Sequence, residues 1–125
     1  MSPLRGCSIL LVTSNEIYKS YISELLRIWG CELHFFDNVD KSLLFIATTK
    51  PNLTALIVPF KHKGASGEKI AKLICEEVGK SVPWICMHVG APNAAPNLSD
   101  QQASGVLGAM FTPEELYAEI ARLRT

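Results

Sequence analysis

The 125-residue sequence lacks an excess of charge of either sign and lacks any long hydrophobic run. Its 12 lysines and arginines balance 12 aspartates and glutamates. A nucleic-acid groove or an anionic membrane surface usually requires a basic excess, so we expect no nucleic-acid partner. No apolar run approaches the roughly 20 residues of a membrane span, and we expect no signal peptide. Direct contact between this domain and a membrane is therefore not expected.

Patterns that bind metals or form disulfides are also missing. The cysteines form no C-x-x-C pair, and the three histidines do not approach one another at ligand spacing. Three of the four cysteines fall in apolar elements, where a free thiol behaves as a small buried hydrophobe. The four are Cys7, Cys31, Cys75 and Cys86. We expect a reducing, cytoplasmic compartment, no metal and no cofactor.

The composition that remains is that of a globular domain. Hydrophobic residues make up 48% of the chain and charged residues 19%, which excludes disordered and fibrous classes. We expect a single domain over residues 1–125, with about residues 1–5 disordered or left over from cloning. If the first residues are foreign, the domain was cut from a longer protein.

An apolar run that ends at a proline organises the chain. Residues 55–58 are continuously hydrophobic, which is typical of a strand covered on both faces in a parallel sheet. Pro59 lacks an N–H and cannot lie inside a central strand, so it marks the carboxyl end of this one. Ligands of open α/β sheets bind at that end of the strands.

Strands and helices alternate along the rest of the sequence. Short apolar segments predict strands at residues 8–12, 31–35, 55–58, 82–87 and 106–110. Apolar residues at three- and four-residue steps predict helices between them and after the last, with Asp37 or Asn38, Ser66 and Thr112 as caps. Residues 90–97 contain two prolines, so we expect a loop there with at most a short helix from Ser99. Right-handed crossovers then give a doubly wound parallel sheet with helices on both faces.

The opening segment resembles that of receiver domains of two-component signalling, most closely those of hybrid sensor histidine kinases. The resemblance is carried by Ile9-Leu10-Leu11-Val12-Thr13-Ser14-Asn15-Glu16-Ile17-Tyr18-Lys19, then Leu25-Leu26 and Trp29-Gly30. It implies a flavodoxin-like (βα)5 fold with strand order 2-1-3-4-5 and, in this chain, a short or irregular fourth helix. It also implies a regulatory rather than an enzymatic domain, whose parent protein is a kinase or a regulator, and it is compatible with an inner-membrane anchor in that parent.

The residues that do the chemistry of active receivers are absent from the matching positions. The resemblance places the metal-binding acids on Thr13 and Ser14, and the phosphoryl acceptor on Pro59, a register supported by Gly67. It places the hydroxyl residue after the fourth strand and the lysine after the fifth on His88 and Ala109.

These losses remove phosphoryl chemistry on physical grounds. Mg²⁺ prefers carboxylate oxygens, and the hydroxyls of Thr13 and Ser14 supply no charge. Phosphoryl transfer needs a nucleophilic oxygen and neutralisation of charge, which Pro59 and Ala109 cannot provide. We therefore interpret the chain as a pseudo-receiver that takes up no phosphoryl group.

Two functions remain open for such a domain. The first is an interaction module that docks a histidine kinase, a phosphotransfer domain, a true receiver or a second copy of itself. The second is a sensor that binds a small anion or metabolite in the vacated acceptor pocket, with His88 as a ligand contact or simply as a residue that fills space. An unrelated flavodoxin-like enzyme is a remote third, because no nucleophile–base pair is found.

The first predicted helix carries the expected docking surface. Its core stripe is Tyr18, Ile22, Leu25 and Trp29. A second stripe lies beside it and consists of Ile17, Tyr21, Glu24 and Ile28. In receivers this helix commonly meets the kinase or phosphotransfer partner, so the resemblance implies the same use here. The alternative is that Ile17 and Ile28 are covered by neighbouring loops.

Overall fold

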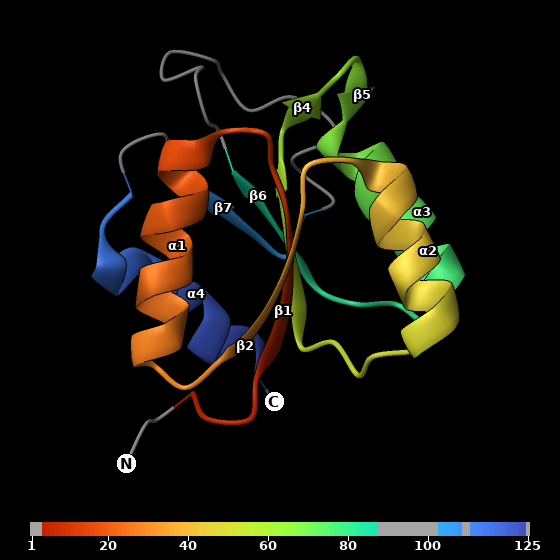
Figure 1. Ribbon diagram of the computed structural model, residues 1–125. Helices are drawn as coiled ribbons and strands as arrows, with labels where there is room; N and C mark the ends of the chain where they lie inside the picture. Colours follow the sequence, from red (N-terminus) through yellow and green to blue (C-terminus); the bar gives the residue numbers. More distant parts are fainter. Residues whose placement is uncertain (1–3, 88–102, 109–110, 125) are drawn as a thin grey trace.

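The computed structural model describes residues 4–87, 103–108 and 111–124 and forms a three-layer α/β sandwich (Figure 1). The central sheet is parallel and contains Ser8–Val12 (β1), Glu32–Phe36 (β2), Ala55–Pro59 (β3), Trp84–Met87 (β6) and Gly105–Leu107 (β7). The helices are Glu16–Ile28 (α1), Val39–Thr49 (α2), Gly67–Val78 (α3) and Pro113–Leu123 (α4). Lys61–His62 (β4) and Ala65–Ser66 (β5) form a separate antiparallel pair.

The sheet has the order β2-β1-β3-β6-β7, so its five strands follow the order 2-1-3-4-5 along the chain. The predicted flavodoxin-like fold class is therefore confirmed. The bounds of four strands differ from the prediction. β2 covers Glu32–Phe36 rather than 31–35, and β3 runs through Pro59 rather than ending at residue 58. β6 begins at Trp84 rather than at residue 82, and β7 covers Gly105–Leu107 rather than 106–110. Residues 109–110, and the predicted loop and short helix between residues 90 and 100, lie outside the described residues.

Two hydrophobic clusters hold the layers together, one on each face of the sheet. In Figure 1, α1 and α4 cover one face, and α2 and α3 cover the other. Alternate residues of the central strand feed the two clusters: Ile57 faces the first, and Leu56 and Val58 the second. All five residues of β3 are buried. The continuous apolar run is thus explained by helices on both sides of the strand.

Side-chain caps start each of the four described helices, as the sequence predicts. Asn15, Asn38 and Ser66 accept hydrogen bonds from backbone N–H groups in the first turns of α1, α2 and α3. Thr112 and Glu115 form a reciprocal capping box at α4. For α2 the sequence left Asp37 or Asn38 open, and the cap is Asn38. These caps fix the points at which the chain leaves the carboxyl edge of the sheet.

The segment after β3 forms a short antiparallel hairpin. His62 pairs with Ala65 across a tight hairpin, and the two residues between them have positive φ, 49° at Lys63 and 87° at Gly64. This backbone is that of a turn matched to the twist of paired strands. His62 is buried, with Nε2 3.1 Å from the Asp37 carbonyl oxygen.

The four cysteines form no disulfide, and their surroundings match the reading of thiols as small hydrophobes. Cys7 and Cys86 are buried, and Cys31 and Cys75 are half-buried. Burial, with a smaller effect of the neighbouring Cys7, raises the pKa of the Cys31 thiol to about 11.

Leu4, in the stretch expected to be disordered or foreign, is 1% exposed and belongs to the core.

The start of α3 is pressed against the end of β3. The Gly67 N–H donates to the Phe60 carbonyl oxygen at 2.8 Å, and a Cβ at residue 67 would lie 2.6 Å from the Pro59 carbonyl oxygen. That oxygen belongs to the backbone and cannot rotate away. Glycine is therefore required here by a close approach of the two segments.

The variant Gly67→Ala should destabilise the fold by about 1–3 kcal/mol, because the new methyl group overlaps the Pro59 carbonyl. Gly108→Ala is the matched control: a Cβ there meets nothing within 4 Å, so the change should stay within about 1 kcal/mol. Urea denaturation followed by circular dichroism measures both. Equal stability of the two variants would contradict the close contact.

Candidate functional site

The carboxyl edge of the parallel sheet brings together three of the predicted site positions, namely Thr13, Ser14 and Pro59. Leu11 of β1 is paired with Ile57 of β3, so continuing this register by two residues places Thr13 level with Pro59. Pro59 is itself paired with Met87 at the end of β6. The backbone therefore assembles the edge at which ligands of open α/β sheets bind. What the edge can do depends on the side chains that stand there.

The polar groups after β1 are used in local structure. Thr13 is 3% exposed; its N–H donates to the Phe36 carbonyl oxygen at 3.1 Å, and its Oγ1 accepts from the Asn15 N–H at 3.1 Å. Asn15 Oδ1 accepts from the N–H groups of Ile17 and Tyr18 at 3.0 and 3.1 Å. Ser14 is exposed. Ordinary capping thus accounts for Thr13 and Asn15, and neither supplies negative charge.

Pro59 occupies the end of β3 with a side chain that has no chemistry. It is buried, and the following N–H, that of Phe60, donates to the Met87 carbonyl oxygen at 3.0 Å. The missing N–H of proline is tolerated at this last strand residue. The position offers neither a nucleophile nor a ligand for a cation. Any activity at this edge would have to come from other residues.

His88 and Ala109, the two remaining positions, lie outside the described residues. They follow Met87 directly and Leu107 by two residues. In the described part of the chain, no group of three or more His, Cys, Asp or Glu side chains is arranged to hold a metal ion. None of the described helices is both long and apolar enough to cross a membrane.

The second stripe of α1 divides into exposed and packed residues. Ile17 is 79% exposed and Ile28 is 60% exposed, so no described loop covers them. Glu24 is exposed and pairs with Arg27 one turn along. Tyr21 lies differently from the other three: it is half-buried, its ring centroid lies 5.5 Å from that of Phe111, and its hydroxyl donates to the Phe111 carbonyl oxygen. The exposed stripe is therefore Ile17, Glu24 and Ile28.

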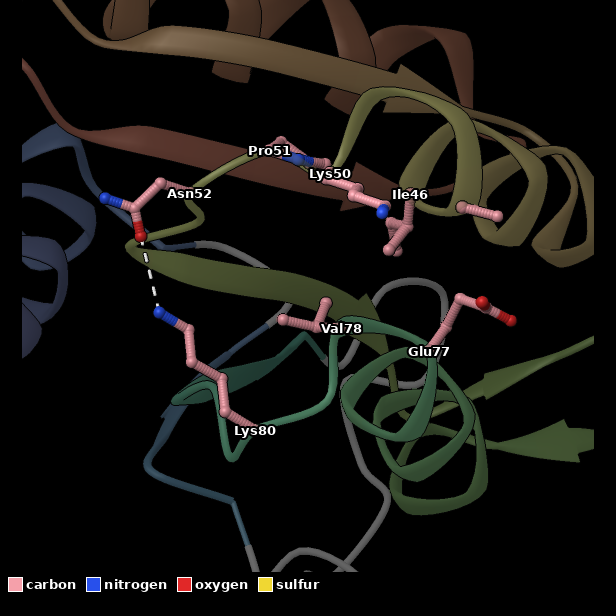
Figure 2. Close-up of a pocket in the computed structure, with 8 residues that line it drawn as sticks. Ile46, Lys50, Pro51, Asn52, Glu77, Val78 and Lys80 are labelled. Atoms are coloured by element: carbon pink, nitrogen blue, oxygen red, sulfur yellow. Dashed lines mark hydrogen bonds between the residues drawn. The ribbon is translucent and has the colours of Figure 1, made fainter.

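A cavity of about 580 Å³ lies at the opposite, amino edge of the sheet, between the carboxyl ends of α2 and α3 (Figure 2). Lys50 and Lys80 lie on two sides of it, and Lys80 Nζ donates to Asn52 Oδ1 at 3.3 Å. Two lysines are balanced there by Glu77 and by the partial negative charge of two helix carboxyl ends. The sum of these charges is close to zero, so charge alone favours neither an anion nor a cation as the ligand of this cavity. The sequence reading missed this cavity because it depends on how two helices end side by side.

The sequence matches no protein-family model and no curated protein. Solved structures do match. The receiver domain of a sensor histidine kinase from Pseudomonas aeruginosa, with a magnesium ion in its active-site cleft, is 21% identical, with 94% of this chain and 97% of that one covered and a TM-score of 0.77.

Two further structures lead to the same result. The chemotaxis protein CheY4 of Vibrio cholerae is 17% identical, with 94% of this chain and 98% of that one covered and a TM-score of 0.76. A signal receiver domain of an HD domain-containing protein from Pseudomonas fluorescens is 19% identical, with coverages of 95% and 94% and a TM-score of 0.75. At these identities the likeness establishes the receiver fold.

Millimolar Mg²⁺ should leave the amide resonances of Thr13, Ser14 and Phe60 unchanged, because no carboxylate stands at residues 13, 14 or 59. A nuclear magnetic resonance titration measures this. The double variant Ser14→Asp with Pro59→Asp restores two acids at this edge and serves as the positive control. Saturable shifts at these amides in the unaltered chain would contradict the prediction.

Proposed function

We propose that this chain is a receiver-like interaction or regulatory module of two-component signalling that works without accepting a phosphoryl group. The observation that carries the proposal is Pro59, buried at the end of the central strand of a receiver fold. A side chain without an oxygen cannot form an acyl phosphate. The module is proposed to be non-enzymatic, and its parent to be a hybrid histidine kinase or a related regulator.

Two further observations support this assignment. Thr13 spends its hydroxyl on the Asn15 N–H, whereas the structurally similar receiver from Pseudomonas aeruginosa holds a magnesium ion in its active-site cleft. The four free cysteines fit a reducing compartment, so we place the module in the cytoplasm. Glu16 and Glu68 lie in the first turns of α1 and α3, outside the strand ends.

The proposed partner is a protein: a histidine kinase, a phosphotransfer domain, a receiver domain or a second copy. Exposed isoleucines at Ile17 and Ile28, separated along one flank of α1, support docking through this helix. Large aliphatic side chains at such exposure contribute little to folding and lower solubility unless a partner covers them. Ligand sensing in the acceptor pocket has less support, because the Thr13 hydroxyl and the Asn15 amide are already used as caps.

Incubation with acetyl phosphate and Mg²⁺ should leave the intact mass of the protein unchanged, because residue 59 has no carboxylate to attack phosphorus. An active receiver treated in the same tube confirms that the reagent works. A base-labile mass increase of one phosphoryl group on any Asp or Glu of this chain would overturn the central part of the proposal.

The double variant Ile17→Ser with Ile28→Ser tests the docking surface. Since both side chains are exposed, the free energy of unfolding should change by less than about 1 kcal/mol. Self-association, or binding to kinase and phosphotransfer domains encoded beside the gene, should weaken by about tenfold, as expected for loss of interface contacts. Sedimentation and calorimetry measure these quantities.

Leu44→Ser is the matched control, because Leu44 is 66% exposed but lies on α2, on the other face of the sheet. Its substitution should leave binding unchanged. A loss of several kcal/mol of stability in the Ile17 and Ile28 variant, with binding intact, would place the docking surface elsewhere.

A further inference from the structure

A small aromatic notch lies where the end of α1 meets the start of α4. Trp29 caps the carboxyl end of α1, and Tyr117 lies in the second turn of α4; their ring centroids are 5.2 Å apart and the ring planes are at 81°. Together with Pro113 and Glu114, these rings line a cavity of about 250 Å³. Figure 1 shows α1 and α4 on the same face of the sheet.

The two rings are only partly used by the core. Both pack against the hydrophobic cluster of this face, and both remain half-buried rather than buried. A perpendicular aromatic pair with part of its surface accessible offers ring faces that carry partial negative charge. Packing against the core explains why the two rings lie here. It does not account for the part of each ring that remains accessible to a ligand.

Glu114 supplies the charge of the notch. It is exposed, and its carboxylate has no hydrogen-bond or ion-pair partner within the described ranges. The adjacent acid, Glu115, is committed to the capping box with Thr112. The first turn of α4 thus holds two negative charges against a helix dipole equivalent to about half a positive charge. The local charge is negative, and an anion is excluded as the ligand.

We propose that this notch binds the arginine side chain of a partner protein. A guanidinium group is planar, weakly hydrated and able to stack on an aromatic face while it donates two hydrogen bonds to one carboxylate. Lysine, a strongly hydrated point charge, matches this combination less well. The volume of about 250 Å³ lies below the usual range of roughly 300–1,000 Å³ for small-molecule pockets and suits a single side chain.

The notch is independent of the vacated acceptor edge and does not rest on the proposed function. It uses none of Thr13, Ser14 or Pro59. Ile28, the residue before Trp29 in the chain, is 60% exposed, so the same end of α1 also carries an apolar side chain that a partner could contact. Interfaces commonly combine a buried aromatic or arginine anchor with flanking apolar contacts.

The test is a nuclear magnetic resonance titration of the whole chain with N-acetyl-arginine-methylamide. The chain has two tryptophans, and the indole N–H of Trp29 should shift saturably while that of Trp84, 8% exposed, stays fixed as an internal control. A probe of this size should bind with a Kd of roughly 1–50 mM. The citrulline analogue, which has the same shape and no charge, should bind at least about threefold more weakly.

Substitutions then identify the groups responsible. Glu114→Gln should weaken the arginine probe about threefold or more, whereas Glu77→Gln, an exposed acid on α3, should have no effect. Tyr117→Leu, which removes the ring, should weaken binding about two- to fivefold, and Tyr117→Phe, which keeps it, should stay within about twofold. These variants keep Trp29 and its packing against the core.

Three results would overturn the proposal. The first is the absence of a saturable Trp29 shift up to about 100 mM probe, well above the expected Kd. The second is equal binding of the arginine and citrulline probes, which would show a site for any polar group. The third is tighter binding of tetramethylammonium than of the arginine probe, which would assign the notch to free alkylammonium ions.

Discussion

The backbone contact between Pro59 and Gly67 fixes the geometry on which the rest of the structure depends. The Pro59 carbonyl leaves no room for a side chain at residue 67, where a Cβ would stand 2.6 Å away. This contact sets where α3 begins relative to the end of β3. Because β3 pairs with β1 on one side and β6 on the other, it also sets the position of the whole carboxyl edge. The fully buried central strand, together with Gly67, which no residue with a side chain can replace without strain, thus maintains the receiver fold.

In the proposed function, the same edge keeps this architecture without the phosphoryl chemistry of active receivers. Thr13 carries a neutral hydroxyl that accepts from the Asn15 N–H, and Pro59 presents no nucleophile. Maintaining the scaffold costs the same conformational entropy whether or not the edge reacts. The exposed side chains include Ile17 and Ile28 on α1, and Glu114 in the first turn of α4 beside the aromatic notch. In the proposed function, a partner therefore binds the helices rather than the edge of the sheet.

Local signals in the sequence predicted most of the fold. Apolar runs predicted the five strands, the resemblance to receivers supplied their order in the sheet, and Ser66 and Thr112 start helices as expected. The hairpin after β3 could not be predicted, because the left-handed backbone at Lys63 has no side-chain signature. The burial of His62 depends on a carbonyl 25 positions away in the sequence. In the candidate site, the position of Thr13 and Pro59 at one edge of the sheet could be predicted from the strands that they follow and end. The packing of Tyr21 and the contact between Trp29 and Tyr117 could not be predicted, because both depend on how α1 packs beside α4 and the residues before it.

Beryllofluoride with Mg²⁺ mimics a phosphorylated aspartate, and its effect on the amide spectrum tests the central claim most directly. The claim is that this receiver fold does not respond to phosphoryl chemistry at its carboxyl edge. With Pro59 in place of an acceptor, the spectra recorded before and after addition should superimpose at Thr13, Ser14, Phe60 and Leu107. A saturable, Mg²⁺-dependent set of shifts at these residues would show that the edge still binds the phosphoryl mimic, and would contradict the account.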